Sequence, residues 1–252
     1  FDMIRSLRLN VPVNVAFNNQ ETLGKLVQRL STQLEPDSLA LEVAFTNTPF
    51  LQENGFTEET ILALFIPNTY EFYWNTPANK IANKLAKEYN KFWNEDRLAK
   101  AKAKNLTPIQ VYTLASIVHK ETAKVDERPD VAGVYLNRLR QDMPLQADPT
   151  IIYAIKLRSG DFDQEIKRVF YNDLRIKSPY NTYINKGLPP GPIAMPDVSA
   201  IDAVLNAEKH DYIYFCANPD KPGYHAFASS YEAHQVNAKK YADWVTKLGI
   251  DR

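Results

Sequence analysis

Apolar residues recur with the period of an α-helix just after residue 106, and this pattern predicts the central helix of the chain. Its start is marked by Thr107 as the cap, Pro108 at the first helical position, and Gln110, which completes a capping box. At about 100° per residue, one broad apolar face follows. That face collects Val111, Leu114, Ala115, Ile117 and Val118.

Glu121 falls inside this apolar face, whereas His119 and Lys120 fall outside it. A buried carboxylate is unfavourable unless it is paired, neutral or needed for function. One interpretation is structural, with Arg128 or Arg138 holding the acid in an ion pair. The other is chemical, because burial raises the pKa of a carboxyl toward neutral pH and so suits a general acid. The helix pattern alone leaves both interpretations open.

The rest of the second half reads as helices, one irregular stretch and a hairpin. Asp126 and Pro129 open a second helix over DVAGVYLNRLR, and Pro144 ends it before the polar turn LQADPT. IIYAIKL is helical, and SPYNTYINKGLPPGPIAMP is a long irregular stretch of the kind that is often functional. VSAIDAVLNA predicts another helix, YIYFCA and HAFAS a hairpin, and residues 231–248 a closing helix.

The first half predicts a small mixed domain. VNVAF alternates like a strand, GKLVQRLSTQL has helical spacing, and SLALEVAF fits a short helix or a strand. We interpret the aromatic residues of ILALFIPNTYEFYW as a core strand, with stacking on sugar faces as the alternative. Residues 78–104 predict one long amphipathic helix with a solvated lysine face. The expected domains are residues 1–104 and 105–252, in an α+β fold whose larger, helix-rich domain carries a small β-sheet.

Composition narrows the function classes. The 252 residues are 44% apolar and 24% charged, and the 30 basic and 30 acidic residues cancel, so no overall field favours nucleic acid. One cysteine, Cys216, excludes an internal disulfide and a multi-thiolate zinc site. No H-E-x-x-H, G-x-S-x-G, Walker or Rossmann pattern occurs, and no apolar run reaches 18 residues. Acid–base chemistry by a carboxylate remains, and no metal or cofactor is expected.

Several motifs in the second half together carry a family resemblance. ASIVHKET, ERPDVAGVYLNRLRQDMPLQADPTIIYA, SPYNTY, GLPPGPIAMP and GYHAF occur in this order over roughly residues 106–235. This combination resembles the endolytic murein transglycosylases of the YceG/MltG family. The resemblance implies a LysM-like module near the N-terminus and an N-terminal membrane anchor that is missing from this chain. It also implies a place in the cell envelope, on the periplasmic side of the inner membrane, and peptidoglycan strands and cell-wall synthesis proteins as partners.

The resemblance further implies a reaction. Glu121 would protonate the glycosidic oxygen between N-acetylmuramic acid and N-acetylglucosamine, and would then take the proton of the muramyl 6-hydroxyl as that oxygen attacks. The product is a 1,6-anhydro sugar. The substrate-binding positions that match the family are Gln146, Asp148, Asn181 and Tyr183, with Tyr153 and His225 as weaker candidates. The chain departs from the family at His119, where many members carry a second glutamate.

Two alternatives belong to other classes. One is a non-catalytic scaffold that binds glycan and recruits cell-wall synthesis partners. The other is a hydrolytic muramidase in which Asp148 serves Glu121 as a second carboxylate. A buried Glu121 beside an open groove favours an enzyme, and a salt-bridged Glu121 away from any cleft favours the scaffold.

Overall fold

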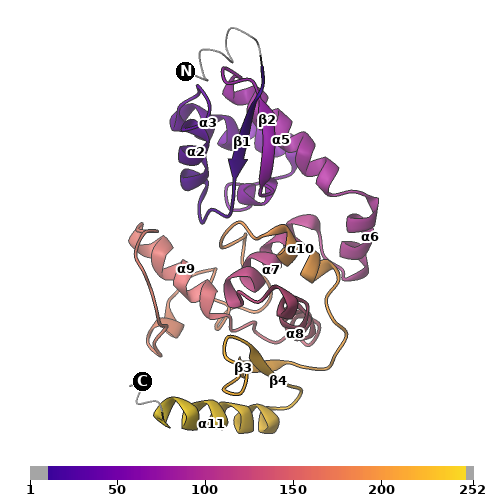
Figure 1. Ribbon diagram of the computed structural model, residues 1–252, viewed down its shortest axis with the longest axis vertical. Coiled ribbons are helices and arrows are strands. Elements are labelled where there is room, and N and C mark those ends of the chain that lie inside the picture. The colour runs from indigo at the N-terminus through magenta and orange to yellow at the C-terminus, as the bar shows by residue number, and fades with distance from the viewer. Residues whose placement is uncertain (1–10, 248–252) are drawn as a thin grey trace. The chain divides into compact units, whose positions relative to one another are not determined.

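The computed structural model describes residues 11–247 and groups them in two compact units. One unit holds the residues up to 116 together with 190–198, and the other holds 117–189 and the residues from 199 on. Helices dominate, and two small two-stranded sheets complete the structure, which confirms the α+β class (Figure 1). Whether residues 1–104 and 105–252 act as separate functional modules stays a prediction.

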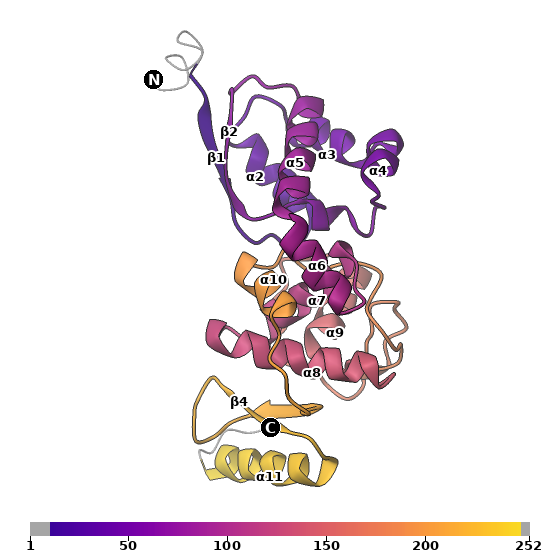
Figure 2. The same ribbon diagram turned by 90° about the vertical axis from the view of Figure 1, so that its right-hand side faces the viewer.

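The first unit begins with a strand, returns through helices, and pairs that strand with a second one. The elements are β1 (Val13–Phe17), α2 (Leu23–Ser31), α3 (Ser38–Thr46), α4 (Thr48–Asn54), the 3₁₀ helix η1 (Ile61–Leu64) and β2 (Asn68–Phe72). The two strands are antiparallel, with Val15 opposite Tyr70 (Figure 2). SLALEVAF is a helix because the Asp37 side chain caps it, accepting the Ala40 N–H at 2.7 Å.

The single helix predicted over residues 78–104 is two helices, α5 (Ala78–Phe92) and α6 (Glu95–Ala103). Trp93 leaves the helical conformation and is buried, with 4% of its surface exposed. Asn94 then starts a new helix, because its side chain accepts the backbone N–H of Arg97 at 3.0 Å. The lysine pattern continues across this break, which is why periodicity alone did not show it.

The central helix α7 (Pro108–Glu121) forms as predicted. The capping box is present: the Thr107 N–H donates to the Gln110 side chain at 2.8 Å, and the Gln110 N–H donates to the Thr107 hydroxyl at 3.2 Å. Residues 111–118 are all buried, so the middle of the helix is enclosed on every side, the polar Thr113 and Ser116 included. The boundary of the two units falls within this helix, after Ser116.

The second unit contains the C-terminal end of α7 and the remaining elements. These are the 3₁₀ turns η2 (Val125–Glu127) and η3 (Asp173–Arg175), the helices α8 (Arg128–Arg140), α9 (Asp148–Ser159), α10 (Val198–Leu205) and α11 (Tyr231–Lys247), and the strands β3 (Tyr214–Ala217) and β4 (His225–Ala228). The predicted hairpin is confirmed, with Phe215 opposite Phe227, and α11 lies along it in both views (Figures 1 and 2). Position 248 of the predicted last helix lies outside the described residues. No helix of residues 11–247 has the length and apolar character needed to cross a membrane.

A buried part of α8 holds the segment that leads into the hairpin. The Asn137 amide donates to the carbonyl oxygens of His210 and Tyr212, each at 2.8 Å. Gly133 allows this approach, because a Cβ at that position would meet the His210 ring. The hairpin is therefore fixed to α8, the helix that also faces Glu121.

A close backbone contact in the first unit predicts the effect of one substitution. A Cβ on Gly191 would overlap the carbonyl oxygen of Glu59, so Gly191→Ala should destabilise the protein by about 1–3 kcal/mol or more. Gly24→Ala is the matched control, because the nearest atom to its Cβ would be the Thr22 hydroxyl at 3.8 Å. Chemical denaturation should show Gly24→Ala within about 1 kcal/mol of the parent; equal stability of the two variants would contradict the contact.

Candidate active site

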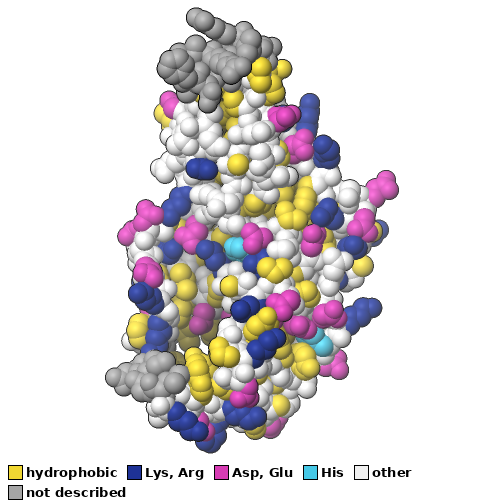
Figure 3. All heavy atoms as spheres, viewed as in Figure 1, with side chains coloured by type: hydrophobic (Ala, Val, Ile, Leu, Met, Phe, Trp, Pro, Cys, Tyr) yellow, Lys and Arg dark blue, Asp and Glu magenta, His cyan; other side chains and the backbone are white. Residues whose placement is uncertain are grey.

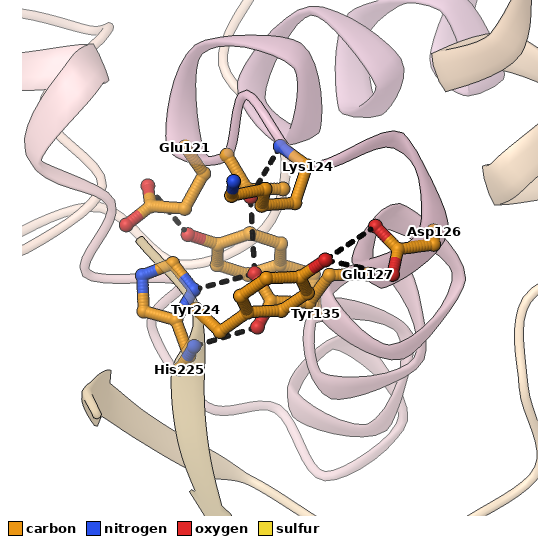
Figure 4. A network of polar contacts seen from close by, with 8 residues as sticks. Glu121, Lys124, Asp126, Glu127, Tyr135, Tyr224 and His225 are labelled. Atoms are coloured by element: carbon orange, nitrogen blue, oxygen red, sulfur yellow. Dashed lines mark hydrogen bonds and ion pairs between the residues drawn. The ribbon is translucent and has the colours of Figure 1, made fainter. Parts of the chain in front are cut away.

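Glu121 is the last residue of α7, and its carboxylate faces α8 (Figure 4). The Tyr135 hydroxyl, on a side chain that is 1% exposed, donates to Oε2 of Glu121 at 3.1 Å. Within residues 11–247, no arginine or lysine lies within ion-pairing distance of this carboxylate. Glu121 is half-buried, and within the same range its carboxylate receives a single hydrogen-bond donor.

The two arginines considered as partners of Glu121 are engaged elsewhere. Arg128 donates to the Ser199 hydroxyl at 2.6 Å and lies 3.3 Å from Nδ1 of His119. Arg138 donates to the carbonyl oxygens of Ile213 and Leu145, each at 2.7 Å. The salt-bridged interpretation of Glu121 is therefore wrong. The placement of His119 on the Arg128 side agrees with its predicted projection away from the acid.

Burial raises the pKa of Glu121 to about 7. The negative charge of Asp148 raises this pKa further, whereas the Tyr135 hydrogen bond and the positive charge of Arg138 lower it. Near neutral pH the carboxyl is then divided between its protonated and ionised forms. Such a group can give up a proton and take one back within a single reaction cycle.

Asp148 and Tyr183 form a second polar pair close enough to influence Glu121. Asp148 is exposed at the start of α9, and the Tyr183 hydroxyl donates to its Oδ1 at 2.5 Å. Burial and this hydrogen bond both raise the pKa of Tyr183, so its hydroxyl keeps its proton. Gln146, two residues before Asp148, is exposed in the left-handed region with φ of 50°.

A set of short hydrogen bonds fixes the loop that carries Tyr183 against the turn before α9. The Gln146 N–H donates to the Thr182 carbonyl at 3.0 Å, and the Ala147 N–H donates to the Thr182 hydroxyl at 3.1 Å. Thr182 also contacts the Thr150 hydroxyl at 2.9 Å. The irregular stretch is therefore held rigidly where it meets α9.

The remaining two predicted site residues hold this loop from inside. Asn181 is fully buried, and its amide donates to the carbonyl oxygens of Leu174 and Ile176 at 3.0 and 2.9 Å. The Tyr153 ring packs on Tyr180 with 4.7 Å between ring centroids. The structure thus brings Glu121, Asp148 and Tyr183 together, with Gln146 adjacent, and places Asn181 and Tyr153 behind them.

Sequence reasoning did not place Tyr135 at Glu121, and it considered Arg138 only as one possible ion-pair partner of the acid. Both lie on the buried side of α8. Their spacing of three positions places them on the same helix face, and this was the sequence pattern that could have indicated polar groups near the acid. In Figure 3 the surface is hollowed beside α9, on the side of the β3–β4 hairpin, and an acidic side chain lies within the hollow. Within the described ranges, no group of three or more His, Cys, Asp or Glu side chains is arranged to hold a metal ion.

These features define the class of protein. It is an α+β protein in which a carboxyl with a pKa of about 7 lies near a second carboxylate. The comparisons with known proteins then give the family. The YceG-like family model matches residues 1–240, and the chain belongs to this family.

Named relatives and a solved structure agree with this assignment. An endolytic murein transglycosylase of Bacillus subtilis (strain 168) is 36% identical over 176 residues, which are 69% of this chain and 46% of the relative. One of Streptococcus pneumoniae serotype 2 is 40% identical over 144 residues, covering 56% of this chain and 25% of the relative. The chain thus spans less than half the length of these relatives. A crystal structure of a YceG-like protein from Listeria monocytogenes matches with a TM-score of 0.72 and 26% identity, over 93% of this chain and 79% of that one.

The electrostatics of Glu121 predict opposite pKa shifts for two neighbouring substitutions. Tyr135→Phe removes a hydrogen bond that favours the ionised form, so the pKa of Glu121 should rise above about 7. Asp148→Asn removes a nearby negative charge, so the same pKa should fall. Carbon-13 NMR titration of the labelled glutamate carboxyls measures both, and shifts of the same sign would contradict this account.

Proposed function

We propose that this chain is the catalytic part of an endolytic peptidoglycan transglycosylase, with Glu121 as its acid. The observation that carries the proposal is the environment of Glu121: a pKa of about 7, one hydrogen-bond donor and no ion-pair partner among the described residues. A structural carboxylate is normally held by a cation, whereas a general acid must keep its proton at the working pH. The names of the relatives from Bacillus and Streptococcus supply the substrate class.

In this proposal the reaction needs only protein groups and the substrate. Protonated Glu121 donates to the glycosidic oxygen as the bond from the muramyl anomeric carbon to that oxygen breaks. The muramyl 6-hydroxyl oxygen attacks the anomeric carbon, and the Glu121 carboxylate takes its proton. The enzyme returns to its starting state, no water is consumed, and the product carries a 1,6-anhydro end. Asp148, Tyr183 and Gln146 contact the sugars, and Asp148 steadies the positive charge that develops at the anomeric carbon.

The first unit is proposed as a LysM-like, glycan-binding module. It has an open pocket lined with amide and charged side chains, which suit hydroxyl-rich ligands. The pocket lining includes Asn18, Asn19, Gln20, Arg29, Asn68 and Asp197. We place the protein at the cell envelope, held by an N-terminal anchor outside this chain and working with cell-wall synthesis proteins.

A hydrolytic muramidase is the second candidate, and the Tyr183–Asp148 pair is the observation that favours it. A second carboxylate close enough to raise the pKa of Glu121 could instead activate a water molecule. Because the Tyr183 hydroxyl donates to Oδ1 of Asp148, the other carboxylate oxygen, Oδ2, would be the one that activates the water. The two candidates share Glu121 and differ in their nucleophile.

Replacing the acid tests the role that both candidates share. Glu121→Gln keeps the shape but cannot donate the proton, so turnover of purified peptidoglycan should fall by about 10²–10⁴-fold. Stability provides the control. The folded pKa of about 7 exceeds the ordinary value of 4.5, so ionisation destabilises the wild type as pH rises through this window. The variant should therefore be the more stable protein above pH 7 and lose that advantage at acid pH. A folded Gln variant with full activity would refute the assignment.

The products separate the two candidates. Internal attack by the 6-hydroxyl predicts muropeptides that end in 1,6-anhydromuramic acid, each one water lighter than the hydrolysis product and resistant to borohydride. Mass spectrometry of early digests should also show long strands shortened internally. Ordinary reducing ends would refute the transglycosylase and support the muramidase, and Asp148→Asn should then lose the activity.

A further inference from the structure

A second glutamate, Glu127, accepts a hydrogen bond from Thr122, the residue that follows Glu121, and its environment is the opposite of that of Glu121 (Figure 4). Its side chain is 4% exposed and receives three donors. The backbone N–H of His225 donates to Oε1 at 2.6 Å, and the Thr122 hydroxyl donates to Oε2 at 3.0 Å. Nδ1 of the His225 ring lies 2.8 Å from the same Oε2.

This arrangement fixes how the His225 ring is protonated. A carboxylate is an acceptor only, so Nδ1 must carry the proton that it shares with Glu127. The Thr122 hydroxyl donates its proton to Glu127 and accepts the Lys124 N–H at 3.1 Å, so it does not compete for Nδ1 of His225. In the neutral ring, Nε2 is then left with an unshared electron pair.

The other ring nitrogen has no hydrogen-bond partner within the described part of the chain, and it points toward Glu121. In Figure 4, Nε2 lies on the side of the ring that faces the Glu121 carboxylate. An aromatic side chain packs against the ring: Phe215 of β3 meets it edge-on, with 5.0 Å between the ring centroids. The same Phe215 packs on Tyr135, with 5.8 Å between their ring centroids. The His225 side chain keeps 16% of its surface exposed, and its Nε2 is not one of the fully buried nitrogen atoms that lack a partner, so Nε2 is accessible.

We propose that His225 is a further substrate-binding residue, whose Nε2 accepts a hydrogen bond from a hydroxyl of the sugar bound at Glu121. Glu127 and Thr122 are positioning residues that fix its tautomer and place. The inference rests on the proposed function, because it takes the ligand to be a sugar at that site. A saccharide hydroxyl suits an acceptor that is held rigidly beside an acid, since the bond directs that oxygen without adding charge.

Thr122 links the Glu127–His225 pair to the segment that carries Glu121. It directly follows Glu121, so the bond from its hydroxyl to Glu127 ties the end of α7 to the start of β4. Among residues 11–247, the charged group that pairs with the ring is Glu127 of η2. Asp126, its neighbour, turns the other way and accepts from the Tyr224 hydroxyl at 3.0 Å.

Two substitutions remove the acceptor in different ways. His225→Asn keeps a side-chain N–H near the position of Nδ1 for Glu127 but has nothing at the position of Nε2. Glu127→Gln still accepts the His225 backbone N–H through its oxygen, while its amide donates to Nδ1. That donation forces the ring proton onto Nε2 and turns the acceptor into a donor.

Each substitution should lower kcat/KM on purified glycan strands by roughly threefold to tenfold, the loss expected for one net hydrogen bond. The loss should appear mainly in kcat if the bond aligns the reacting sugar. The double variant should lose no more than either single one, because both remove the same interaction. Asp126→Asn is the matched control: it also converts an acid of η2 to its amide and should leave the rate unchanged.

The position of the proton on the His225 ring can be measured directly, and a purely structural role for Glu127 would not require it to change in the variant. Long-range proton–nitrogen NMR of the substrate-free protein should show the His225 proton on Nδ1 in the wild type and on Nε2 in Glu127→Gln. A wild-type ring protonated on Nε2, or on both nitrogens at the assay pH, would overturn the inference. So would a folded His225→Asn variant with wild-type kcat/KM. Failure of the proposed function is distinct, because the wild type itself would then leave glycan strands uncut.

Discussion

The proposed function of this site depends on one property of Glu121, a pKa of about 7. Three effects act in the same direction. The residue ends α7, where the carbonyl end of the helix dipole disfavours a negative charge. The carboxyl is also removed from water and lies near the charge of Asp148. The Tyr135 hydrogen bond and the Arg138 charge moderate these effects, so the pKa stays about 7 instead of rising beyond any useful range. An ion pair with Arg128 or Arg138 would have removed this property.

The chain places a contrasting glutamate six residues later. From the part of the chain that the structure describes, Glu121 receives one donor, whereas Glu127 receives three and is more deeply buried. A carboxylate with three donors is well stabilised inside a protein, and it fixes whatever donates to it. Glu127 therefore joins the end of α7, five residues before it, to the start of β4, 98 residues after it, and this junction holds the end of the helix that carries the acid. One glutamate is suited to transfer a proton and the other to fix geometry.

Local signals predicted most elements, and long-range contacts decided what remained. The capping box at Thr107, the apolar face of α7 and the hairpin depend on neighbouring residues, and each formed as predicted. The break after α5 was missed because burial of Trp93 and capping by Asn94 override a continuous lysine pattern. In the candidate site, spacing pointed to Glu121 and the family motifs pointed to Asp148 and Tyr183; the structure brings these three together, and their roles stay predictions. Tyr135 was not identified as part of the site, because its contact spans 14 residues and depends on how α7 and α8 pack.

Asn181 and Tyr183 belong to the same motif, but their side chains make different kinds of contact. Asn181 is buried and satisfies two carbonyl groups of its own loop, so it sets the path of the backbone. Its Oδ1 accepts the Tyr183 N–H at 2.8 Å, which aims the tyrosine at Asp148. A side chain whose hydrogen bonds are already made within the protein does not have to be reorganised when a substrate arrives. The rigid loop thus fixes the position of Asp148 through the Tyr183 hydrogen bond. The negative charge of Asp148, held in this position, raises the pKa of Glu121 without any direct contact being needed.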